Sequence, residues 1–128
     1  MISTDDHLQE VGILIDELVS HGFKPVLIGG MALVTLGSQR VTMDFDFVIS
    51  QPDQELDILV NILYKNGLEL ITRLDDNGEV IRTIDNPKVA AIRLRLDQPK
   101  SALFFKPKTE LRIDLLFDFP IAAVELMG

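Results

Sequence analysis

Residues 44–47 read Asp-Phe-Asp-Phe, and this alternation of charged and aromatic side chains is typical of a β-strand with two different faces. Successive side chains of a strand point to opposite faces, so Asp44 and Asp46 share one face and Phe45 and Phe47 share the other. A shift of the strand by one residue would bury both acids, so the aromatic pair fixes the register. The segment predicts a strand with a core face and an acidic face.

The two carboxylates on that strand predict a cation site. Their Cα atoms stand about 6.6 Å apart at the usual rise of a strand. Carboxylates this close repel each other, and burying the pair without a cation would raise one pKa strongly. Hard oxygen ligands of this kind suit Mg²⁺.

A pair of glycines precedes the acidic strand, directly after the apolar run 26–28. Glycine tolerates positive φ and lets a ligand approach the backbone closely. We expect a tight turn at Gly29 and Gly30, followed by a short helix over 31–36 whose N–H groups point at an anion. A phosphate chain is the natural occupant. Together, the glycine turn and the paired carboxylates predict a site for a metal-bound nucleotide.

The rest of the chain alternates helical and strand patterns. Apolar residues recur at helical spacing between Ser3 and Gly22 and again between Pro52 and Gly67. Residues 79–86 fit either a hairpin return or a short helix. Strand patterns occupy five further segments: 23–28, 68–72, 89–96, 103–106 and 111–117. These elements predict one α/β (α+β) domain over residues 1–128, with a mixed β-sheet flanked by helices.

Composition narrows the class of protein. The net charge of -8 argues against a protein that grips nucleic acid by bulk attraction. Seven basic residues between Lys88 and Arg112 form either a positive flank for a polyanionic acceptor or, as we favour, a solvated set of strand faces and turns. The acidic N-terminus does not read as a signal peptide, and no apolar run approaches about 18 residues. We therefore expect a cytoplasmic protein without membrane contact.

The two histidines, His7 and His21, fall near the two ends of the first predicted helix and share no face with the acids. Structural or solvent-exposed roles are favoured over metal ligation. The chain has no cysteine, which excludes disulfides and thiolate metal sites.

The segment GGMALVTLGSQRVTMDFDF, with a later acid in the hydrophobic strand LRIDLLFDF, resembles the DNA polymerase β-like nucleotidyltransferases. It is most similar to the minimal bacterial branch that includes abortive-infection toxins and antibiotic nucleotidyltransferases. The resemblance covers the catalytic core and implies a nucleotidyltransferase-type sheet without the usual C-terminal helical portion. It also implies that Asp44, Asp46 and Asp114 are the catalytic acids and hold two Mg²⁺ ions.

The implied reaction is transfer of a nucleoside monophosphate from an NTP to a hydroxyl of RNA, a protein or a small molecule. Asp114 would hold the ion nearer the acceptor and take its proton. Met31 stands where many relatives have serine, so part of the triphosphate contact must come from elsewhere. The resemblance implies five nucleotide-binding residues: Gly29, Gly30, Ser38, Arg40 and Thr42.

Several alternatives stay open from the sequence. The enzyme would be the toxin of a toxin-antitoxin pair or a small-molecule modifier, with an antitoxin or a second copy of the chain as candidate partner. A non-catalytic nucleotide- or partner-binding domain of the same fold is the second interpretation, and an unrelated acidic-site α/β protein is the third. At the level of single residues, structural ion pairs of Arg40 with one of the acids, and of Arg112 with Asp114, are alternatives to roles in the site.

Overall fold

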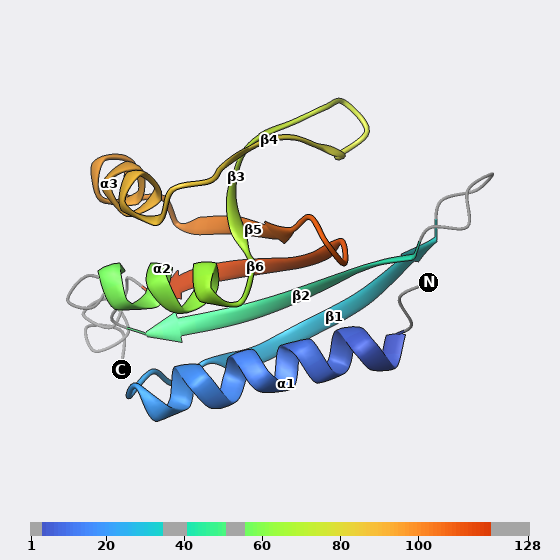
Figure 1. Ribbon diagram of the computed structural model, residues 1–128, viewed down its shortest axis with the longest axis horizontal. Coiled ribbons are helices and arrows are strands. Elements are labelled where there is room, and N and C mark those ends of the chain that lie inside the picture. The colour runs from blue at the N-terminus through green and yellow to red at the C-terminus, as the bar shows by residue number, and fades with distance from the viewer. Residues whose placement is uncertain (1–3, 35–40, 51–55, 119–128) are drawn as a thin grey trace, which may run out of the picture.

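The structure, a computed structural model, describes residues 4–34, 41–50 and 56–118. Within these residues the chain forms three helices and a six-stranded sheet (Figure 1). The helices are α1 (Thr4–Ser20), α2 (Leu56–Lys65) and α3 (Pro87–Asp97). The strands are β1 (Val26–Val34), β2 (Val41–Ser50), β3 (Glu69–Leu74), β4 (Val80–Ile84), β5 (Ser101–Lys106) and β6 (Leu111–Asp118).

The sheet has the strand order β1-β2-β6-β5-β3-β4. The central strands β2 and β6 are parallel, whereas β1–β2, β6–β5, β5–β3 and β3–β4 are antiparallel pairs. The sheet is therefore mixed, and the predicted fold class is confirmed. Because β2 and β6 lie side by side, two segments that are far apart in the sequence meet at the centre of the molecule (Figure 1).

The hydrophobic core lies between one face of this sheet and the helices. Phe45 and Phe47 of β2 are buried there, as the alternation predicted, beside Ile113 and Leu115 of β6. All three helices contribute buried side chains to the same core, namely Leu14, Leu18, Leu59, Leu63, Ala90 and Leu94. No described helix lies on the opposite face, which carries the half-buried acids of β2 and β6.

The glycine pair does not form the predicted turn. β1 runs straight through it, with Gly29 opposite Asp46 and Gly30 opposite Phe45, and a bulge falls between Leu27 and Gly29. The predicted helix over 31–36 is wrong, because residues 31–34 continue the strand, and residues 35–36 lie outside the described residues. A short apolar run cannot be assigned to helix or strand by periodicity alone, and here pairing with β2 decides.

The segment 89–96 was predicted to be a strand and is instead the helix α3. Asn86 caps it by accepting hydrogen bonds from the N–H groups of Lys88 and Val89, and Pro87 begins it. The alternating pattern was misleading because the apolar Ile92 and Leu96 are exposed, at 55% and 79%.

Other predicted elements are found close to where the sequence placed them. Gly22 follows α1 with a φ of +90°, and residues 80–84 form a hairpin return rather than a helix. The predicted first strand begins later, at Val26. His7 is buried, and its Nε2 lies 2.8 Å from the carbonyl oxygen of Thr109, so this histidine has a structural role. Among the described helices, none combines the length and the apolarity needed to cross a bilayer.

Candidate acidic site

The parallel pairing of β2 and β6 brings three carboxylates together on the sheet face opposite the helices. Asp46 is the register partner of Asp114, and Asp44 is the register partner of Arg112. Neighbouring strands lie about 4.8 Å apart, so Asp46 and Asp114 are adjacent across the strands. Asp44 follows two residues away on the same face. The strands β2 and β6 carry the acids that the resemblance groups into one site, and they are neighbours in the sheet.

Electrostatics in this cluster disfavour full ionisation. Burial raises the pKa of Asp44, and the charge of Asp46 raises it further, while the Arg112 guanidinium lowers it. Burial also raises the pKa of Asp114, and the charges of Asp46 and Asp44 add to that effect. A cation placed among the three carboxylates would lower these pKa values, since it favours the charged form of each carboxylate.

Two oxygens of the cluster have no hydrogen-bond donor among the described residues. They are Oδ1 of Asp44 and Oδ1 of Asp114, and both are buried. Buried polar atoms without a hydrogen bond are uncommon in folded proteins. Nε of Arg112 is a third such atom, and it lies 3.9 Å from Oδ1 of Asp44. A cation is one partner that would satisfy the two carboxylate oxygens. Carboxylate oxygens are the donors that Mg²⁺ prefers. The chemistry of the donors therefore fits a divalent cation.

The side chains are not yet arranged around one point. Within the described residues, no three His, Cys, Asp or Glu side chains form a group in metal-holding geometry. The fit to a metal accordingly rests on the donor chemistry and on the two buried oxygens, of Asp44 and Asp114, that accept no hydrogen bond from the described residues. Carboxylate side chains rotate readily, whereas the core fixes the strand register that holds their backbones side by side.

Arg112 also belongs to this site, and it contacts a different acid from the one considered in the sequence analysis. Its Nε lies 3.9 Å from Oδ1 of Asp44, and its Nη2 donates a hydrogen bond to the carbonyl of Gly78 at 2.5 Å. Arg112 pairs with Asp44 rather than with Asp114, the partner that the sequence left open as an alternative. The Arg-x-Asp spacing in β6, which puts both side chains on one face, was the signal for this residue.

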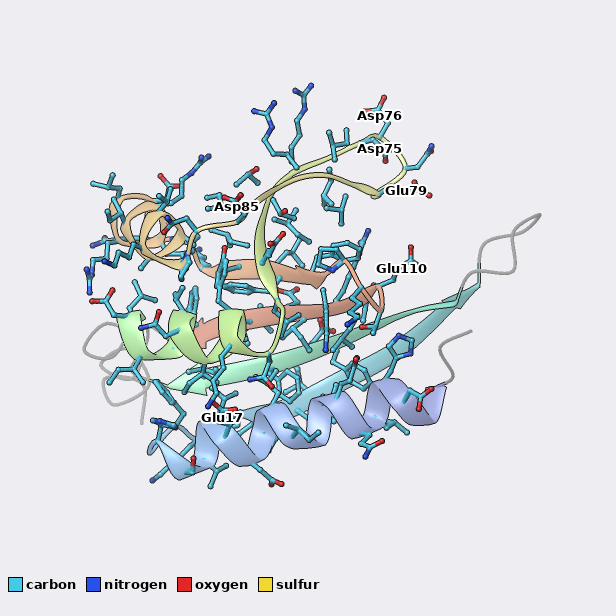
Figure 2. All side chains as sticks on the ribbon, viewed as in Figure 1. Glu17, Asp75, Asp76, Glu79, Asp85 and Glu110 are labelled. Carbon is cyan, nitrogen blue, oxygen red and sulfur yellow. The ribbon has the colours of Figure 1, made fainter. Side chains whose placement is uncertain are left out.

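The hydrogen bond from Arg112 brings the β3–β4 turn toward the acidic face. Asp75 orders this turn, because its side-chain oxygen accepts from the N–H groups of Asn77 and Glu79. Figure 2 shows Asp75, Asp76 and Glu79 together at the tip of the hairpin. Arg112 is thus the link between the turn and Asp44.

Gly29 stands beside the acids by strand pairing rather than by a turn. A Cβ added at this position would lie 3.3 Å from Oδ2 of Asp46, closer than most such contacts. The glycine therefore keeps space open next to that carboxylate. The predicted anion cradle at a helix N-terminus is wrong, because β1 continues where that helix was expected.

The remaining predicted nucleotide-binding residues are placed less completely. Thr42 lies in β2 opposite Leu33, and Gly30 is paired with Phe45. Ser38 and Arg40 lie outside the described residues.

The basic run does not form one positive surface. Arg93 pairs with Asp97 at 3.2 Å, and Arg95 pairs with Asp57 at 2.7 Å. Lys106 likewise lies 3.1 Å from Glu10. The first two pairs are exposed and contribute little to stability, whereas the pair of Lys106 and Glu10 is partly buried. They do neutralise much of the positive charge that a polyanionic acceptor would meet.

The geometry of the acids is the basis for assigning chemistry to this chain. No family model, curated protein or solved structure matches it. The functional proposal therefore depends on the sheet face that no described helix covers. This face carries three neighbouring carboxylates, a guanidinium close to Asp44 and a glycine beside Asp46.

Proposed function

We propose that this chain is a metal-dependent nucleotidyltransferase that moves a nucleoside monophosphate from an NTP to a hydroxyl acceptor. The observation that carries the proposal is the register pairing of Asp46 with Asp114, next to Asp44, on the sheet face that no described helix covers. Two of these acids have buried oxygens without a donor among the described residues. An acid cluster of this kind suits chemistry in which bound metal ions neutralise the charge of a phosphate group.

Each acid has a distinct role in the proposal. Asp44 and Asp46 would hold Mg²⁺, and the resemblance implies two ions, with Asp114 as a further ligand. Bound Mg²⁺ supplies neutralisation of the phosphate charge. Asp114 accepts the proton of the attacking hydroxyl. A carboxylate beside the incoming hydroxyl is the available general base.

Two neighbouring residues support binding of the phosphates. Gly29 has no side chain where a Cβ would lie 3.3 Å from Oδ2 of Asp46, so a metal-bound phosphate would approach the backbone there without a clash. Arg112, whose side chain is 18% exposed, supplies positive charge within reach of Asp44. Gly30, Ser38, Arg40 and Thr42 stay proposed nucleotide contacts on the strength of the sequence resemblance.

A second candidate function is a domain that binds a nucleotide or a partner without turnover. The observation that favours it is the position of Arg112, 3.9 Å from Asp44, where a guanidinium partly replaces the charge of a metal ion. For the active enzyme, the sequence resemblance suggests a toxin that acts in the cytoplasm, with an antitoxin or a second copy of the chain as partner. The acceptor is RNA, a protein or a small molecule.

The test of the proposal is product formation. The purified chain is incubated with Mg²⁺, the four NTPs labelled at the α-phosphate, and tRNA, protein or aminoglycoside acceptors. We expect pyrophosphate release and a labelled acceptor, with a loss of at least about a hundredfold in Asp44→Asn. Asp16→Asn, on the exposed side of α1, is the matched control and keeps full activity.

Two other outcomes are informative. Thermal stabilisation by an NTP and Mg²⁺ without any product favours the second candidate function. Absence of both product and stabilisation with every NTP contradicts the proposed function.

A further inference from the structure

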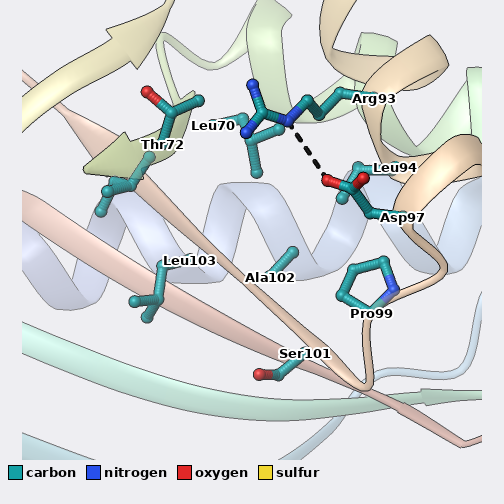
Figure 3. A pocket seen from close by; sticks show the side chains of 10 residues that line it. Leu70, Thr72, Arg93, Leu94, Asp97, Pro99, Ser101, Ala102 and Leu103 are labelled. Atoms are coloured by element: carbon teal, nitrogen blue, oxygen red, sulfur yellow. Dashed lines mark hydrogen bonds and ion pairs between the residues drawn. The ribbon is translucent and has the colours of Figure 1, made fainter. Parts of the chain in front are cut away.

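A pocket opens in the sheet where β3 and β5 separate. The two strands pair at only two positions, Glu69 with Phe105 and Leu70 with Phe104, whereas β5 pairs with β6 along its whole length. Beyond Leu70 the strands diverge, and the end of α3 lies across the gap. The pocket that remains has a volume of about 250 Å³ (Figure 3).

The lining of this pocket is apolar with polar groups at its edges. Leu70, Leu94 and Ala102 are buried core residues that form apolar walls. Ser101 supplies a hydroxyl group, whereas the hydroxyl of Thr72 donates a hydrogen bond to the carbonyl of Arg82 at 3.3 Å; Figure 3 shows both residues at the pocket. The ion pair between Arg93 and Asp97 stands beside them. Apolar walls with a few placed polar groups are typical of small-molecule sites.

The backbone adds a second kind of recognition. Past Leu70 in β3, and from Ser101 to Leu103 in β5, the two strands face each other but their backbones do not pair. An extended edge presents N–H and C=O groups in a fixed row, and these groups need hydrogen-bond partners. A ligand with donors and acceptors along one flat edge matches such a row.

The pocket adjoins the acidic site. Leu103 lines the pocket and is also the register partner of Asp114. Register partners share a face of the sheet and lie roughly 4.5–5.5 Å apart between Cα atoms. Ser101, two residues along β5, lies on the same face. A ligand in the pocket would therefore begin one strand spacing from the carboxylate of the proposed base.

From these observations we infer that the pocket binds a planar heterocycle, the base of the nucleotide whose phosphates occupy the acidic site. The binding of the phosphates at the acids rests on the proposed function, whereas the binding of the base rests on the pocket. The volume of about 250 Å³ lies just below the roughly 300–1,000 Å³ of pockets for drug-sized ligands. It suits a single ring system rather than a whole nucleotide.

A substitution at the pocket rim separates the two halves. Ser101 is exposed, so Ser101→Trp adds bulk that fills the pocket without entering the core. Asn61→Trp is the matched control, because Asn61 is also exposed and lines a different pocket of about 380 Å³ between α2 and α3. Both variants are first checked for an unchanged circular dichroism spectrum and a cooperative thermal transition.

Calorimetric titration then compares three probes: the NTPs with Mg²⁺, inorganic tripolyphosphate with Mg²⁺, and nucleosides alone. We expect at least one NTP to bind the unmodified chain about tenfold or more tightly than tripolyphosphate, about 1.4 kcal/mol per tenfold. Ser101→Trp should abolish this preference and leave tripolyphosphate binding unchanged, while Asn61→Trp keeps the preference.

The outcomes distinguish the two proposals. Equal binding of NTPs and tripolyphosphate to the unmodified chain overturns the base pocket and leaves the acidic site standing, as does a folded Ser101→Trp that keeps the preference. Failure of tripolyphosphate and NTPs to bind overturns the proposed function, and a nucleoside that still binds, in a manner blocked by Ser101→Trp, upholds the pocket.

A measurement on the unmodified chain makes the test independent of any variant. Photo-crosslinking with an NTP that carries an azido group on its base should label residues 70–72 or 101–103. Labelling confined to other segments would overturn the assignment of the base to this pocket.

Discussion

Asp46 of β2 and Asp114 of β6 stand side by side as register partners on two interior strands of the sheet. The core fixes this relationship from the other face, because Phe45, Phe47, Ile113 and Leu115 are buried under the helices. The same packing that stabilises the fold thus forces two like charges together. Removing one of these charges should affect stability and function in opposite directions.

For Asp114→Asn we expect higher stability and lost activity. The variant removes a half-buried charge whose pKa is raised by burial and by two neighbouring acids. Its free energy of unfolding should rise by about 0.5–2 kcal/mol without metal, as is common when active-site strain is relieved. Urea denaturation in EDTA measures this change. A drop in stability would show that the charge of Asp114 does not destabilise the metal-free chain.

The pH dependence of stability should carry the signature of raised pKa values. Since burial raises the folded-state pKa values of Asp44 and Asp114, the folded chain binds these protons more tightly than the unfolded chain does. The stability that these two protonated acids contribute is fully present below their unfolded-state pKa of about 3.9. It is lost as the pH rises through their folded-state pKa values.

Urea titrations from about pH 4 to pH 8 measure this slope. Because the other acids of the chain also titrate, the informative quantity is the difference between the unmodified chain and Asp114→Asn. Stability of the unmodified chain should fall more steeply with rising pH. Mg²⁺ should reduce that fall, and identical slopes for the two proteins would contradict the interpretation.

Gly29→Ala should weaken nucleotide binding without unfolding the chain. The added methyl group would lie 3.3 Å from Oδ2 of Asp46 and so intrude on the acidic site. We expect a loss of about tenfold in affinity for an NTP with Mg²⁺, corresponding to about 1.4 kcal/mol. Isothermal titration calorimetry measures it.

The control for that substitution is Gly12→Ala. Nothing lies within 4 Å of a Cβ at Gly12, which is exposed on α1. This variant should gain about 0.5–1 kcal/mol of stability, because alanine is the better helix former, and bind as before. If both variants lose affinity equally, the contact with Asp46 is not the cause.

Arg112→Gln should loosen the β3–β4 turn and raise the pKa of Asp44 further. The guanidinium bonds to the carbonyl of Gly78 and lowers the pKa of Asp44, so both effects depend on it. Hydrogen exchange of residues 75–79 should become faster, and NTP affinity should fall. Arg95→Gln, which breaks an exposed ion pair with Asp57, should change neither measurement.

The acidic strand was predictable from the sequence because its pattern has one solution. Only a strand separates Asp44 and Asp46 from Phe45 and Phe47, and burial of the aromatic residues then fixes the face of the acids. The resemblance supplied Asp114 on another strand. Parallel pairing of two distant segments is a tertiary property that no local pattern contains.

The errors in the sequence prediction arose where local patterns are ambiguous. The run after Gly30 fits a helix or a strand, and the partner β2 decided in favour of a strand. In α3 the alternation of Ile92 and Leu96 with arginines hid a helix whose signal was the cap at Asn86 and Pro87. The contact between Arg112 and Gly78 depends on how the hairpin folds over the sheet, which the sequence does not encode locally.

Mg²⁺-dependent nucleotide binding by the acid cluster is the most direct test of the central claim. Titration of a non-hydrolysable NTP into the chain, with and without Mg²⁺, should show much tighter binding when the metal is present. Asp46→Asn should lower the affinity by about tenfold or more, about 1.4 kcal/mol. Equal affinity with and without Mg²⁺, or an Asp46→Asn variant that binds as tightly as the unmodified chain, would contradict the claim that these carboxylates form the metal-nucleotide site.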